Sequence, residues 1–194
     1  MDAKQLFFER YQGFREYPEH VVKDLTEDQL RHSPHPSLNP IAWILWHVAR
    51  CEDVAVNRLL TDHPQVFDED EWPTRLRVPG REVGTGMSKA HVTQLCEVIN
   101  LGELDAYRAA VTDRTVAAVA ALPLAELTQE LMQKRLRQVF VDEGAGGTVA
   151  QDIVEAYRGH TKGWLLGHIV LTHPFYHIGQ AFSMRAMLGA PNPW

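Results

Sequence analysis

Three histidines have the spacing and the apolar surroundings expected of metal ligands. His173 and His177 lie four residues apart near the end of the chain, and His47 lies far upstream in an apolar segment. On a helix, side chains at positions i and i+4 share one face about 5–6 Å apart, so two imidazoles there can bind one metal ion. The same spacing is compatible with two ordinary core or surface histidines, so a metal site requires a third ligand from elsewhere in the chain.

The apolar pattern around each histidine predicts that it lies on the inner face of a helix. His173 and His177 share a stripe of helical period with Leu166, Ile169, Val170, Ala181, Met184 and Leu188. His47 shares another with Trp43, Ile44, Cys51 and Val54. A lone histidine on such a face is usually a core residue with one hydrogen bond, but each buried unpaired ring costs about 1–3 kcal/mol. One shared metal ion would satisfy all three rings, which predicts a metal centre.

Four further residues are candidates for the surroundings of this centre. Cys51 lies four residues after His47 and is the obvious fourth candidate ligand, although buried free cysteine commonly behaves as a small hydrophobe. Arg50 could meet an anionic substrate at the mouth of a pocket, but we prefer to interpret it as a solvated arginine. Tyr176 and Gln180 lie on or next to the ligand face and are candidates for orienting a substrate. No residue is assigned as a general base.

His168 is expected to be an ordinary histidine. It lies about 180° around an ideal helix from His177, so it cannot join the same site without a break in the helix.

Composition and charge predict one soluble domain over residues 1–194. With 45% hydrophobic residues, the chain can bury a sizeable core. Its net charge of −6, without a basic cluster, argues against nucleic acid and anionic membranes as partners. The chain opens without a secretory signal, contains no long apolar run and has two cysteines without a disulfide framework. We therefore expect a cytoplasmic protein.

The element pattern predicts an all-α fold, because no stretch alternates long enough with period two to indicate a sheet. Helices are expected over residues 3–25, with a break at Tyr17–Pro18, and over 41–60, 89–100, 101–122, 149–157 and 164–188. Pro123 is expected to start a further helix. Residues 61–87 lack the helical pattern and are predicted to form a long crossover connection anchored by Trp72.

Three segments together form a recognisable pattern: Leu25–Leu30, Ile41–Arg50 with Glu52–Asp53, and His173-x3-His177 followed by Ile-Gly-Gln. In this pattern the chain resembles the DinB-like superfamily, which includes metal-dependent thiol transferases acting with bacillithiol or mycothiol. The resemblance covers nearly the full chain. It implies a four-helix bundle in which His47, His173 and His177 hold a divalent metal. The sequence departs from this pattern at Pro174, which could kink the helix between two ligands, and at Cys51.

Two classes of function follow from these observations. The first is a metal-dependent enzyme in which three imidazoles leave coordination positions open for a low-molecular-weight thiol or water, which then reacts with a small-molecule substrate. Zinc, nickel and iron all suit such a site. The alternative is a non-catalytic metal-binding stress-response protein or a dimeric interaction protein. A buried triad without a channel would favour the alternative, an open pocket beside the triad would favour the enzyme, and a homodimer is compatible with either.

Overall fold

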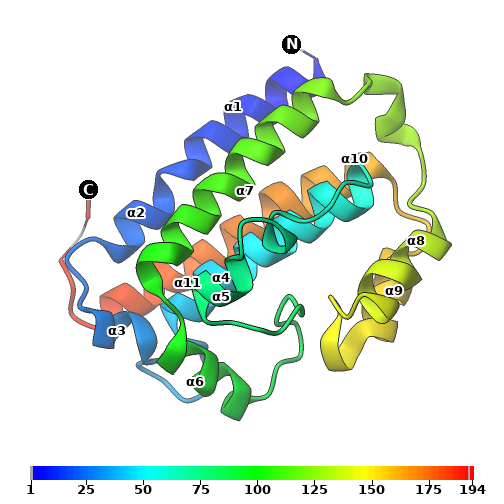
Figure 1. Ribbon diagram of the computed structural model, residues 1–194. Helices are drawn as coiled ribbons and strands as arrows, with labels where there is room; N and C mark the ends of the chain where they lie inside the picture. Colours follow the sequence, from blue (N-terminus) through cyan, green and yellow to red (C-terminus); the bar gives the residue numbers. More distant parts are fainter. Residues whose placement is uncertain (1, 192) are drawn as a thin grey trace.

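Four long helices form the body of the protein in the computed structural model, which describes residues 2–191 and 193–194. They are α1 (Ala3–Arg15), α4 (Ile41–Asp53), α7 (Leu101–Ala121) and α11 (His173–Met187). In Figure 1, α1 lies beside α7, and α4 lies beside α11. The described residues form helices, turns and one isolated bridge between Glu130 and Thr161, with no β-strand, so the all-α prediction is confirmed.

The first long helix ends where the sequence predicts a break. Helix α1 ends at Arg15, and α2 (Tyr17–Val22) begins with Pro18 in its first turn. Proline fits there because the first turn does not need its missing N–H group. The short helix α3 (Glu27–Arg31) follows, with Thr26 as its capping residue.

Two of the long helices contain wider, π-helical segments at the same level of the bundle. Helix α4 continues as η1 (Val54–Leu60), and α11 is preceded by α10 (Lys162–Leu165) and η6 (Leu166–Thr172). The two segments η1 and η6 pack against each other. Pro174 falls in the first turn of α11, directly after η6. The expected helix over 164–188 therefore exists, but its winding changes just before His173.

The expected crossover packs over α4 and α7 and contains η2 (Val66–Asp68) and α5 (Trp72–Leu76). Trp72 is buried and its ring lies 5.4 Å from that of Tyr107, which confirms it as an anchor. Helix α6 (Lys89–Val98) then leads into α7. The crossover returns to α4 through the buried residue Val83.

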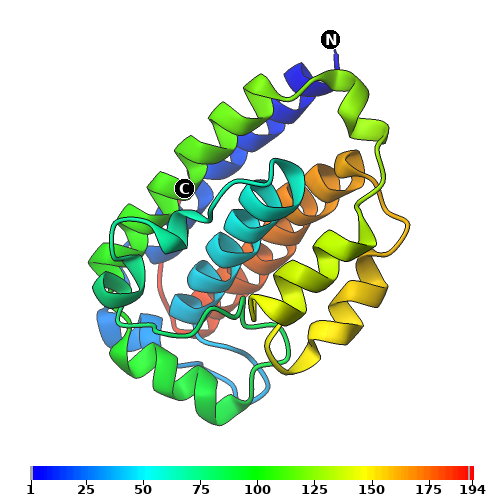
Figure 2. The same cartoon turned by 45° about the vertical axis from the view of Figure 1, so that its right-hand side comes forward.

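The helix expected from Pro123 does not form as one element. It is replaced by η3 (Leu124–Thr128), an extended stretch, α8 (Gln133–Arg137) and η4 (Gln138–Asp142). The extended stretch pairs with the chain before α10, since Leu131 N–H donates to His160 O at 2.8 Å and Lys162 N–H donates to Gln129 O at 2.9 Å. These long-range hydrogen bonds replace those of a continuous helix. After η5 (Gly147–Val149), helix α9 (Ala150–Tyr157) packs against α8, and the pair stands beside the bundle in Figure 2.

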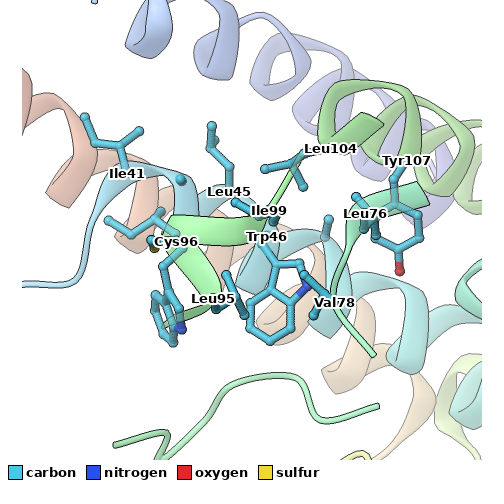
Figure 3. Packing of buried hydrophobic residues seen from close by; sticks show 14 of the residues in the cluster. Ile41, Leu45, Trp46, Leu76, Val78, Leu95, Cys96, Ile99, Leu104 and Tyr107 are labelled. Atoms are coloured by element: carbon cyan, nitrogen blue, oxygen red, sulfur yellow. The ribbon is translucent and has the colours of Figure 1, made fainter. Parts of the chain in front are cut away.

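Helix α4 is the central helix of the bundle. Its first turns are apolar on all sides, as expected for a helix surrounded by protein. Figure 3 shows Trp46 packed among side chains from α6, α7 and the crossover, including Leu95, Leu104 and Val78. No helix in the described part of the chain is long and apolar enough to cross a membrane.

Candidate metal centre

The structure brings His47, His173 and His177 together between α4 and α11. One ring nitrogen from each lies within 4.8 Å of the other two, a separation that could accommodate a shared metal ion. His47 Nε2 lies 3.2 Å from His173 Nε2. His173 is the first residue of α11 and His177 lies one turn later, so both rings face the same residue of α4.

The ring of His47 is fixed by the crossover and by a neighbouring tryptophan. Its Nδ1 donates a hydrogen bond to the carbonyl oxygen of Val83 at 2.5 Å. The Trp43 ring stacks on it, with 4.6 Å between centroids and 12° between planes. A carbonyl oxygen can only accept, so the hydrogen of the neutral ring is on Nδ1 and the Nε2 lone pair faces the other histidines.

His177 is oriented by a similar hydrogen bond within its own helix. Its Nδ1 lies 2.9 Å from Oε1 of Gln180, one turn further along α11. Because the amide oxygen accepts, the lone pair of His177 is also on Nε2. Gln180 therefore orients the ring of His177, whereas the sequence predicted that it would orient substrate.

His173 completes the set but has no such partner. Its Nδ1 is buried and makes no hydrogen bond to any described residue. Its Nε2 faces the Nε2 of His47, which carries a lone pair. A divalent metal ion would accept lone pairs from both nitrogens, so this donor set fits the metal that the sequence resemblance implies.

Burial keeps the three imidazoles neutral. Desolvation lowers the pKa of His47 to about 4, despite the opposing hydrogen bond to Val83. Desolvation and the neighbouring His47 and His177 lower the pKa of His173 to about 2. The pKa of His177 is also lowered by burial, partly offset by the hydrogen bond to Gln180. Neutral rings are the form that binds metal, so protons compete weakly for this site near neutral pH.

Cys51 lies beside the triad. Its Sγ is 3.7 Å from His47 Nδ1 and 3.8 Å from His47 Nε2. A sulfur almost equidistant from both ring nitrogens is displaced from the direction in which Nε2 points its lone pair. Burial also raises the pKa of the thiol to about 12, which favours the protonated form in the absence of metal. The structure therefore places Cys51 next to the histidine cluster but outside it.

A cavity of about 480 Å³ adjoins the triad, and both His173 and Cys51 line it. Its walls come from η1, the end of the crossover, η4, α9 and η6. Tyr176 is not among the lining residues; its ring is 5.3 Å from that of His177, and it is 65% exposed on the outer side of α11.

Arg50 is fully buried, so its interpretation as a solvated arginine is wrong. It donates hydrogen bonds to Asp53 at 3.2 Å, Tyr107 Oη at 3.0 Å, Gln65 Oε1 at 2.8 Å and the Arg81 carbonyl at 2.8 Å. These partners belong to α4, α7 and the crossover. Arg50 thus connects α4 to the crossover at Arg81. Arg81 lies two residues before Val83, whose carbonyl oxygen is the hydrogen-bond partner of His47.

His168 lines the same cavity as His173, although it is not part of the triad. Five residues of α-helix would separate the two side chains by about 140°, whereas wider π-helical winding reduces this angle. His168 lies in η6, and the change from α-helical to π-helical winding occurs there. The apolar pattern of the sequence gave no signal for this change in winding.

Comparison with known proteins gives a family and a similar fold. A sequence model of the DinB superfamily matches residues 10–181. The crystal structure of a conserved protein from Enterococcus faecalis is similar, with a TM-score of 0.68 and 18% sequence identity, over 97% of this chain and 99% of that chain. At this identity the similarity supports the fold alone. No curated protein matched the sequence.

Proposed function

The chain belongs to the DinB superfamily, and from this premise we propose that it is a metal-dependent enzyme that activates a low-molecular-weight thiol or water. The activated group would be transferred to a small substrate or would hydrolyse it. His47, His173 and His177 would hold a divalent zinc, nickel or iron ion. When bound, such an ion lowers the pKa of a thiol or water in its open coordination position.

The observation that carries this proposal is the position of three neutral imidazoles at the wall of a cavity. A structural metal site is usually closed by four protein ligands, whereas a catalytic site combines three with an accessible position. Here three histidines cluster, Cys51 lies outside their cluster, and the cavity reaches His173. This arrangement supports an enzyme over the alternative of a buried, non-catalytic metal site.

The surrounding residues have positioning roles in this proposal. Val83 and Trp43 fix the ring of His47, and Gln180 fixes the ring of His177. Buried apolar side chains, among them Val54 and Ile169, form part of the cavity wall. A cavity of this size and lining is typical of a small-molecule site. The homodimer and the cytoplasmic location stay predictions.

The test is an activity screen on protein loaded separately with zinc, nickel or iron. Each form is incubated with bacillithiol, mycothiol or glutathione and the electrophile 1-chloro-2,4-dinitrobenzene, and separately with p-nitrophenyl esters. We expect a metal-dependent rate that is lost in His173→Ala and kept in His160→Ala, a histidine outside the cavity. If wild type binds one metal per chain yet matches His173→Ala in every reaction, the non-catalytic alternative replaces the enzyme.

A further inference from the structure

The cavity beside the triad is apolar over most of its surface. Buried side chains from five segments form its interior: Val54, Ala55 and Leu59 of η1, Val83 of the crossover, Phe140 of η4, Ile153 of α9 and Ile169 of η6. Apolar walls bind the apolar part of a ligand through burial, at roughly 25 cal/mol per Å² of surface removed from water. A ligand filling this space would therefore present an apolar body to the bundle.

The cavity has few polar groups, and its described lining contains one acidic side chain and no lysine or arginine. The acidic side chain is that of Asp152. The nearby Arg58, on η1, is engaged by Glu143 and Asp62 and does not line this cavity. In the metal-free protein, an anionic ligand would thus meet the negative charge of Asp152 without a lysine or arginine side chain to compensate it.

Asp152 is available for a ligand. It lies in the first turn of α9, it is exposed, and its carboxylate makes no hydrogen bond or ion pair with any described residue. His168 and Thr85 are the other exposed polar residues of the lining. The buried residues and His173 thus form the inner part of the cavity, and Asp152 lies at its rim.

We propose that this cavity takes a small molecule with an apolar body and a positively charged or neutral polar head, and that Asp152 binds the head. The inference rests on the proposed function in one respect, since it treats the occupant of this cavity as the substrate. It goes further by naming the substrate class and a specificity-determining residue. In the metal-free protein, anionic molecules of the same shape are disfavoured, because Asp152 repels them and no lysine or arginine of the lining offsets this repulsion.

The test measures binding to metal-free protein, so that its outcome does not depend on the triad. Isothermal titration calorimetry at pH 8 and low salt compares 3-phenylpropylamine, 3-phenyl-1-propanol and 3-phenylpropionate, which share one apolar body. We expect the amine to bind about fivefold more tightly than the alcohol, the scale of one exposed ion pair, and the carboxylate to bind most weakly. Asp152→Asn should make the affinities for the amine and the alcohol similar. Asp142→Asn changes an exposed aspartate outside the cavity and should leave the order of the three affinities unchanged.

A second pair of variants tests the location. Ala156 is exposed and lines the cavity, so Ala156→Phe should weaken binding of all three probes without disturbing the core. Ala117→Phe, at an exposed position of α7, should leave the binding of all three probes unchanged. The proposal is overturned if the carboxylate binds as tightly as the amine, if Asp152→Asn leaves the amine preference intact, or if none of the probes binds. Failure of the triad to bind metal would instead overturn the proposed function and leave this binding unaffected.

Discussion

Two hydrogen bonds at the outer nitrogens of His47 and His177 determine where their lone pairs point. Val83 accepts one of them and Gln180 accepts the other. Such partners usually matter for metal sites because they fix both the tautomer and the orientation of the ring. The geometry of the candidate centre therefore depends on residues that would not touch the metal.

Removing the partner of His177 should weaken metal binding. Gln180→Ala leaves Nδ1 of a half-buried ring without its acceptor, so we expect zinc affinity to fall by about 10–100-fold. Gln180→Glu keeps an acceptor oxygen and should retain most of the affinity. Competition titration with a zinc chelator measures both. Equal affinity for wild type and Gln180→Ala would show that this hydrogen bond does not position the ring.

Arg50 should contribute to stability through its buried ion pair with Asp53. Arg50→Met would leave the buried carboxylate of Asp53 without its cation, and breaking such a pair costs about 3–5 kcal/mol. In urea unfolding, Arg158→Met serves as the control, because it removes an exposed ion pair with Glu155 and should cost less than about 1 kcal/mol. Similar losses in the two variants would contradict the anchoring role of Arg50.

At the residue scale, the sequence could predict the triad but not the role of Arg50. The histidines are recognisable because they interrupt local apolar stripes, which depend only on neighbours along one helix. Arg50 lies beside such a stripe, and its partners Gln65, Arg81 and Tyr107 are 15, 31 and 57 positions away. No local pattern can show that a long-range network will bury an arginine.

Among the elements, the crossover is the one that connects distant parts of the chain to the triad. It approaches α4 very closely at Gly84, which has a φ of +93°. A Cβ atom built there would lie 2.6 Å from the Trp46 ring and 3.1 Å from the Trp43 ring. Only glycine fits this backbone conformation and this contact without strain. Its neighbour Val83 is the acceptor for His47.

Gly84→Ala should therefore affect both stability and the metal site. We expect a loss of about 1–3 kcal/mol in unfolding free energy, because of the positive φ and the tryptophan contacts. Displacement of Val83 should lower zinc affinity by about tenfold or more. Gly80→Ala is the control in the same loop, since a Cβ there meets only the Glu82 side chain at 3.8 Å or beyond. Unchanged zinc affinity in Gly84→Ala would refute the link between the crossover and His47.

Sequence reasoning at the element scale succeeded where the signals are local. The break at Tyr17–Pro18 follows from residue type, because proline fits the first turn of a helix and not its interior. The π-helical winding of η1 and η6 does not, because their residues are compatible with an ordinary helix and the wider turns arise where the two segments pack against each other. These turns are typical of functional sites, and here they form walls of the cavity.

For the molecule as a whole, the buried histidines should make stability depend on pH. The unfolded chain takes up protons on histidine as the pH falls through about 6.5. In the folded protein His47 and His173 resist protonation until their pKa values of about 4 and about 2. Between the unfolded pKa of about 6.5 and these lower folded values, the unfolded state binds more protons than the folded state. The contribution of both residues to stability is therefore complete above pH 6.5 and is lost as the pH falls.

We therefore expect metal-free wild type to lose more stability between pH 8 and pH 5 than His173→Leu does. Urea unfolding in the presence of a chelator, at several pH values across this range, measures the difference. The variant is the appropriate reference because all other titrating groups are common to both proteins. If the unfolding free energies of the two proteins changed equally with pH, His173 would titrate in the folded protein as it does in the unfolded chain, which would contradict this prediction.

The all-α class and the long helices could be predicted for the whole molecule, because apolar stripes of period 3.6 extend over most of the chain. The resemblance to the DinB superfamily is confirmed by the match over residues 10–181. The cavity could not be predicted, since its walls combine residues from Cys51 to His173, and η4 and α9 contribute to them through long-range packing against the bundle.

The most direct test of this account is the metal content of tag-free protein, stripped by a chelator and reloaded with zinc, nickel or iron under reducing conditions. Elemental analysis should find about one metal ion per chain in wild type and in His168→Ala, whose altered residue lines the cavity outside the triad, and none in His173→Ala. Wild-type protein that takes up none of the three metals, or His173→Ala that binds as much as wild type, would contradict the metal centre.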